Sequence, residues 1–238
     1  MKILISLLLI GVNFYSYSQN QVVRTLDHRG TGWMNDLIMS DYNGRPFKLY
    51  YEGVEGTPFM FDEWKLADIT LSRGKKFEKI KARVDLCSQE AHFITRNNVE
   101  IVTHNGLVTK IVLFDSTTAG MDSFTLKTGF PAIDNQNENN FYELLSDGRA
   151  QLVKSIRKKI VEKKNDVSGQ VEKEFDSYEN YYVFNKGVIK KIKRDKASVL
   201  DLLNDQQEKI EEFIKSNNIN LKRTDSLIRL FDYYNSLK

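Results

Sequence analysis

The amino-acid sequence predicts an α+β fold: an antiparallel β-meander, as a twisted sheet or partly open barrel, with a C-terminal layer of short amphipathic helices. Residues 45–193 alternate apolar and polar side chains and carry turn residues at short intervals. This pattern is typical of antiparallel strands that bury one face. Residues 194–238 instead repeat apolar side chains every three or four positions, as amphipathic helices do.

The strands are predicted from alternation and from the turn residues between them. Alternation is cleanest at 79–86, and Asn105-Gly106 and Asp147-Gly148 favour hairpin turns. The polar stretch 163–176 is interpreted as a flexible excursion between two hairpins. The predicted strands are 47–51, 79–86, a meander of 90–95, 99–103, 107–114 and 123–127, and two hairpins, 141–146 with 149–156 and 181–184 with 188–192.

Three apolar stripes predict three short helices in the tail. Asp205 and Glu208 have capping-box spacing, so one helix is expected to begin there, and Asn217-Asn218 to end it. A final helix is expected from about Thr224. Short helices cannot bury their stripes alone, so these are expected to pack on the sheet or on each other; a separate helical appendage is the alternative. The stripes are Val199, Leu202 and Leu203; Ile210, Phe213 and Ile214; and Leu227, Ile228, Phe231 and Tyr234.

The N-terminus has the three parts of a secretory signal peptide. Lys2 is followed by an apolar run at 3–12, and Ser16 and Ser18 favour cleavage before Gln19. A membrane anchor is the alternative, but the apolar run is shorter than a bilayer requires. We therefore expect an exported protein that is periplasmic, outer-membrane-associated or extracellular, with no transmembrane segment in the mature chain. The predicted division is 1–18 signal peptide, 19–44 N-terminal segment, 45–193 β-rich domain and 194–238 helical segment.

The inventory of chemically active residues is poor. Cys87 is the only cysteine, so no internal disulfide forms, and the formal net charge of +3 is too small to indicate nucleic-acid binding. No nucleophile elbow, phosphate-binding loop or common zinc motif is present. Of the three histidines, His28 is the best site candidate, although a surface loop is the simpler interpretation, and His92 and His104 are expected to be solvated. We predict no catalytic residue, metal site or cofactor.

One distinctive segment resembles a known group of proteins. The residues Gly56-Thr57-Pro58-Phe59 and Glu63-Trp64, the strand-and-turn region 69–74, the segment 141–148 and the tail from Lys196 to Asn235 carry the resemblance. They resemble an uncharacterised family of secreted proteins from Bacteroidota-type Gram-negative envelopes. The sequence departs from that family at Arg83-Val84-Asp85, where Arg-Tyr-Asn is expected. The resemblance implies secretion and a shared architecture, and it implies no activity.

The same segment contains the candidate binding residues, Phe59, Asp62, Glu63 and Trp64. Trp64 beside two carboxylates suggests a sugar-binding or glycosidase-like cluster, but neighbouring residues on a strand point to opposite faces. The alternative is that Trp64 is a core or hairpin aromatic. Two basic clusters, 154–164 and 186–196, either protect a sheet edge from pairing or meet anionic lipid headgroups.

Three functions remain open from the sequence. The first is a non-enzymatic envelope protein that binds another envelope component. The second is a periplasmic carrier of a lipid or other apolar ligand, and the third is a hydrolase whose site assembles from scattered residues. The expected partners are accordingly an envelope protein or a lipid, with no role for nucleic acid.

Overall fold

The computed structural model describes residues 51, 53–95, 98–103, 106–115, 122–164 and 169–237. The predicted signal peptide, the N-terminal segment and the start of the strand at 47–51 lie outside these residues, as do His28 and His104. Within the described ranges, no helix is both long enough and apolar enough to cross a membrane.

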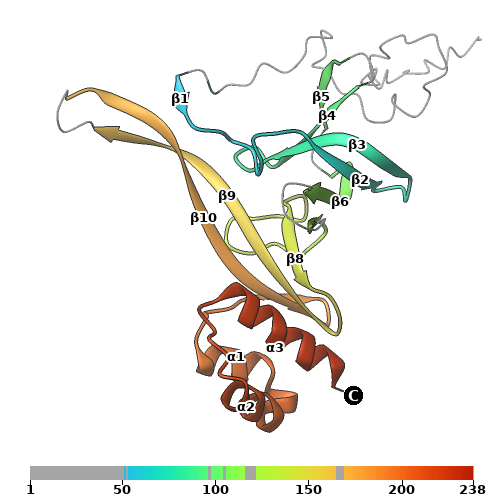
Figure 1. The fold of residues 1–238 in the computed structure, drawn as a ribbon, viewed down its shortest axis with the longest axis vertical. Coiled ribbons are helices and arrows are strands. Elements are labelled where there is room, and N and C mark those ends of the chain that lie inside the picture. Colours follow the sequence, from blue (N-terminus) through green and yellow to red (C-terminus); the bar gives the residue numbers. More distant parts are fainter. Residues whose placement is uncertain are drawn as a thin grey trace, which may run out of the picture.

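A single open, twisted sheet carries the strands of the described residues, and three helices lie against one end of it (Figure 1). The order across the sheet is β1-β10-β9-β8-β7-β6-β2-β3-β4-β5, and β11 also pairs with β10. The strands are β1 Val54–Glu55, β2 Lys65–Leu71, β3 Lys76–Asp85, β4 Glu90–Ile94, β5 Glu100–Val102, β6 Val108–Asp115, β7 Asp122–Lys127, β8 Tyr142–Ser146, β9 Ala150–Lys164, β10 Val171–Asn185 and β11 Val188–Lys191. The α+β prediction is confirmed.

The predicted antiparallel meander is only partly right. The neighbours β4–β5, β6–β7, β8–β9 and β10–β11 are antiparallel hairpin pairs as expected. However, β6 does not pair with β5; it lies between β2 and β7, and β1 runs parallel to β10, so the sheet is mixed. Turn residues show where the chain reverses, but the choice of neighbour depends on which strands complete the core.

The interpretation of 163–176 as a flexible excursion is wrong for the described part of that stretch. Strands β9 and β10 pair in continuous antiparallel register from Ala150 with Asn185 to Lys164 with Val171. Opposite charges face each other along this hairpin, as in the ion pair between Lys163 and Glu174. Cross-strand ion pairs let a polar ribbon form strands without burying apolar side chains.

The predicted helices are confirmed. Helix α1 spans Lys196–Leu202, α2 spans Gln207–Ser216 and α3 spans Thr224–Ser236, with a 3₁₀ turn at Asn204–Gln206. Asp195 caps α1 by accepting a hydrogen bond from the Ser198 amide. The capping box at Asp205 does not form, because α2 is preceded by Gln206 without a side-chain cap and Asp205 instead accepts from the Tyr234 hydroxyl.

The sheet and the helices have separate apolar cores. One core lies between residues of β2, β3, β4, β6 and their neighbours, including Ala67, Val84 and Ile111. The second lies where the helices pack on the base of β9 and β10, and includes Leu152, Val183 and Phe231. The helical layer is therefore packed on the sheet, and each of its apolar stripes contributes a fully buried residue.

A small aromatic cluster on the other face of β9–β10 contains one unsatisfied hydroxyl. Tyr142 and Tyr182 lie edge to face, and the Tyr182 hydroxyl donates to Asp134 and accepts from Gln136. The buried Tyr142 hydroxyl has no hydrogen-bond partner among the described residues. Burial raises the pKa of Tyr142 to about 12, so this hydroxyl stays neutral at physiological pH.

This contrast predicts opposite effects for two identical substitutions. Tyr142→Phe should be neutral or stabilise the protein by up to about 1 kcal/mol, because it removes an unpaired buried group. Tyr182→Phe should cost about 1–3 kcal/mol, because the buried Gln136 amide loses its acceptor and Asp134 loses one of its two partners, keeping Lys191. Urea denaturation of both variants measures the difference. Equal losses in the free energy of unfolding would contradict the finding that, of the two hydroxyls, only that of Tyr182 is hydrogen-bonded among the described residues.

Candidate functional site

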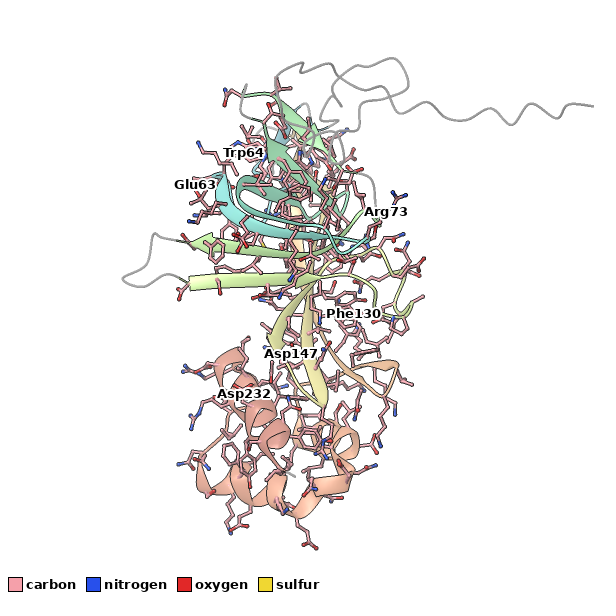
Figure 2. All side chains as sticks on the ribbon, turned by 90° about the vertical axis from the view of Figure 1, so that its right-hand side faces the viewer. Glu63, Trp64, Arg73, Phe130, Asp147 and Asp232 are labelled. Atoms are coloured by element: carbon pink, nitrogen blue, oxygen red, sulfur yellow. The ribbon has the colours of Figure 1, made fainter. Side chains whose placement is uncertain are left out.

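Two of the four predicted binding residues come together. Phe59 bridges to Asp85 at the end of β3 and is 4% exposed, and Trp64 lies just before β2, so that both rings contact the Arg83 side chain. Asp62 and Glu63 are exposed, and Glu63 makes an ion pair with Lys65 at 3.5 Å. Figure 2 shows Glu63 and Trp64 at one end of the β2–β3 hairpin and Arg73 at the other. The two carboxylates are therefore not brought together with the rings in one site.

The two rings enclose an arginine that sequence reasoning did not select. The Arg83 guanidinium lies 3.6 Å from the Phe59 ring centroid and 4.3 Å from that of Trp64. Its Nη2 donates to both carboxylate oxygens of Glu100, at 2.8 and 3.0 Å. Cation–π stacking and charge-assisted hydrogen bonds thus hold Arg83 from three sides.

His92 completes the cluster, and its prediction as a solvated residue is wrong. It is paired with Arg83 across β3 and β4 and is 2% exposed, with its ring edge to face against Phe59. Its Nδ1 lies 2.6 Å from Glu100 Oε1, and its buried Nε2 has no partner among the described residues. Alternation placed His92 on the outward face correctly; the segment around Phe59 covers that face.

We call Phe59, Trp64, Arg83, His92 and Glu100 the arginine cluster. Burial alone would raise the pKa of the Glu100 carboxyl, but the hydrogen bonds from His92 and Arg83 outweigh it and lower that pKa below its ordinary value. Arg83, His92 and Glu100 contact one another across β3, β4 and β5, and Arg83 Nε is buried without a hydrogen-bond partner among the described residues. In the described ranges no group of three His, Cys, Asp or Glu residues could hold a metal ion.

The lowered pKa of Glu100 predicts a pH-dependent contribution to stability. A carboxyl with a lowered pKa in the folded state stabilises the protein above its unfolded pKa, near 4.5, and loses that contribution as pH falls through the folded value. Glu100→Gln should therefore cost about 1–2 kcal/mol at neutral pH. The difference from the parent protein should shrink steadily below pH 4.5, measured by urea denaturation across the pH range; a constant difference would contradict it.

The second unusual feature is the free end of the β9–β10 hairpin. Strand β8 pairs with β9 only as far as Lys154, and the hairpin continues beyond it, away from the helices (Figure 1). We call residues 157–164 of β9 and 171–179 of β10 the arm. Its base is anchored, because Lys158 Nζ donates to the carbonyls of Thr57 and Phe59.

The arm exposes large apolar side chains. Ile160, Val171 and Tyr178 are 40%, 61% and 38% exposed, and they make up half of the exposed large hydrophobic residues among the described part of the chain. Phe175 is covered by Tyr51, whose ring lies 5.1 Å away edge to face. Ile160 and Val171 lie on one face of the ribbon and Tyr178 on the other, so the arm exposes apolar side chains on both faces, where a binding protein can cover them.

The charges of the arm are divided between its strands. Residues 157–164 contain five basic residues and one acidic residue, and residues 171–179 contain four acidic residues and one basic residue. Within the arm the two sets pair, as Lys159 does with Asp176 at 3.8 Å. The basic residues of β9 were identified from the sequence. The acidic residues of 171–179 were not identified as their partners, because most of them lie in the stretch that was interpreted as a flexible excursion.

No known family, curated protein or solved structure matches the chain. What the arginine cluster and the arm can do therefore follows from their geometry.

Proposed function

We propose that the mature chain is an exported, non-enzymatic protein of a Gram-negative envelope, and that it binds another envelope protein through the arm. The leader-like N-terminus and the resemblance to secreted envelope proteins support export. The observation that carries the binding role is the arm itself, where β9 and β10 continue beyond β8 with only the two-residue strand β1 beside β10, and where Ile160, Val171 and Tyr178 are exposed.

The energetic argument favours a binding role for these side chains. An exposed two-stranded ribbon is marginally stable by itself, and exposed apolar residues on it add a risk of aggregation. Burying a side chain such as Ile or Tyr stabilises a complex by about 1.5–3 kcal/mol. The arginine cluster fits a structural role instead, since Arg83, His92 and Glu100 pair with one another, with only Arg83 Nε and His92 Nε2 buried without a partner among the described residues.

Native mass spectrometry of the mature protein, purified gently from its own envelope, tests the proposal. We expect a complex with one second polypeptide at fixed stoichiometry. A variant with Ile160→Thr and Tyr178→Thr should lose that polypeptide, because threonine keeps the strand preference but removes the apolar contact. The matched control, Leu66→Thr with Val188→Thr, changes two exposed apolar residues outside the arm and should retain it.

Other outcomes contradict the proposal. A bare monomer, or a partner that both double variants retain equally, would exclude binding through the arm. A bound species of lipid mass that survives in all variants would favour the alternative function, a carrier of an apolar ligand.

A further inference from the structure

The outer edge of β9 in the arm offers unpaired backbone groups. Near its base that edge is already used, since the Lys158 amide donates to the Leu86 carbonyl and the Ile156 carbonyl accepts from Gln89. Backbone groups of an antiparallel pair alternate in direction from one residue to the next. The groups of Ile160, Glu162 and Lys164 therefore also point outward, and they have no backbone partner among the described residues.

An added strand can extend a sheet at such an edge. The chain itself does this on the opposite side of the ribbon, where β1 pairs with β10 at Lys173 and Glu174. Main-chain hydrogen bonds supply affinity in this mode, and the alternating side chains supply specificity. The apolar side chains of Ile160 and Val161 lie next to the open edge, where they can pack against an incoming strand.

The charge of β9 indicates what kind of strand it accepts. Neighbouring strands lie about 4.8 Å apart, so an added strand lies nearer to the basic side chains of β9 than to the acidic side chains of β10. Like charges directly across a strand pair are unfavourable, and opposite charges are favourable. Lys159, Lys163 and Lys164 therefore favour an acidic neighbour.

Other occupants fit less well. A symmetric pairing of two copies through β9 would oppose two basic strands. A head-to-tail pairing needs the outer edge of β10, which β1 partly occupies. Residues 19–50 of this chain contain four basic and three acidic residues, so they do not supply an acidic strand. A flat anionic lipid surface meets no continuous basic face, because Lys159 and Lys163 lie on the face of the ribbon opposite that of Lys164.

We infer that the outer edge of β9, residues 159–164, binds an extended acidic segment of the partner protein by β-strand addition. This inference rests on the proposed binding function and specifies the chemistry of the partner. The segment pairs with the outward groups of Ile160, Glu162 and Lys164 and places acidic side chains beside the lysines.

A labelled peptide with the sequence of residues 171–179 is the probe, since it is the acidic strand that β9 already pairs with on its inner side. Fluorescence anisotropy should show binding to the mature full-length protein that falls steeply as salt is raised. A peptide with lysine in place of each acidic residue should bind at least tenfold more weakly.

Two proline variants locate the binding edge. Ile160→Pro removes an outward amide of β9 without removing a hydrogen bond between β9 and β10, and should weaken peptide binding at least tenfold. Ser177→Pro is the matched control: Ser177 is paired with Lys158, so its amide also points outward, but at the opposite edge of the ribbon. It should change binding less than twofold, and circular dichroism and urea denaturation should show equal stability of the two variants.

Several results would overturn the inference. These are no peptide binding, equal binding of the lysine peptide, or equal weakening by both prolines. Self-association that Ile160→Pro abolishes would assign the edge to a second copy, and binding to phosphatidylglycerol vesicles in place of the peptide would assign it to lipid headgroups. If the arm double variant still loses its envelope partner while the peptide results fail, the binding function stands and only the acidic strand is excluded.

Discussion

Replacing Arg83 by methionine should lower the free energy of unfolding by about 3 kcal/mol. Removing one member of a buried ion pair costs about 3–5 kcal/mol, because the other charge stays without compensation. The lower value applies because Glu100 is partly exposed and can take up water in the variant. The methionine side chain still packs between Phe59 and Trp64, so the loss reports the hydrogen bonds and charge of the guanidinium.

Urea denaturation of Arg83→Met, Arg83→Lys and Arg73→Met measures this effect. The lysine variant keeps the charge but not the forked, planar geometry, so it should recover only part of the loss. Arg73 lies exposed in the β2–β3 turn, and its substitution should change stability by less than about 0.5 kcal/mol. Equal stability of Arg83→Met and Arg73→Met would show that the cluster does not hold this end of the sheet.

The second large effect is expected at Gly148, in the turn between β8 and β9. A Cβ there would lie 2.5 Å from Cγ of Asn235, and the backbone φ of +151° is one that other residues rarely adopt. Asn235 accepts from the Ala150 amide and donates to the Ala150 carbonyl, which ties α3 to the turn. Gly148→Ala should therefore cost about 2–4 kcal/mol, from backbone strain and from the lost hydrogen bonds.

A double-mutant cycle separates the two causes. Gly187, in the turn between β10 and β11, also has a positive φ, but a Cβ added there would have no atom within 4 Å. Gly187→Ala therefore reports strain alone, at about 1 kcal/mol. On an Asn235→Ala background, Gly148→Ala should cost about 1–2 kcal/mol less than in the parent protein, because the contacts with Cγ and Nδ2 of Asn235 are absent and only the contact with its Cβ, at 2.9 Å, remains. If Gly148→Ala and Asn235→Ala lower the free energy of unfolding additively, the cost at Gly148 does not come from a clash with Asn235.

The junction at Gly148 also matters for the architecture. Figure 2 shows Asp147 and Asp232 where the β8–β9 turn meets α3, and Asp232 accepts a hydrogen bond from the Ser146 hydroxyl. With Asn235, this contact attaches the helical layer to the end of β8 and to the start of β9, the strand that continues into the arm. We therefore expect the substitution at Gly148 to loosen the helices while the core around Val84 and Ile111 stays folded.

Much of the secondary structure could be predicted from local patterns. The tail helices follow from stripes such as Leu227 and Phe231, which are buried against β9 and β10 as their spacing requires. The hairpin at Asp147-Gly148 follows from turn chemistry, which acts over a few residues. The spacing of apolar side chains, the turn residues and the helix ends are properties of short segments, so they can be predicted directly from the sequence.

The candidate site was predicted less well for the same physical reason. Phe59 and Trp64 were selected for their unusual local sequence, but Arg83, His92 and Glu100 come from three other strands. Nothing in the immediate neighbourhood of His92 shows that the segment around Phe59 covers it. Burial of a polar residue depends on what packs over it from a distant part of the chain.

The sequence by itself determined that this protein is a mixture of strands and tail helices, with a single cysteine. Only the tertiary structure decided that β6 lies between β2 and β7 and that Arg83 is enclosed by two rings. It also decided that polar residues of 163–176 form the ends of β9 and β10 in the arm. These features depend on pairing between residues far apart in the chain. Their free energy comes from the completed sheet, where cross-strand contacts offset the entropy lost in closing the long loops between them.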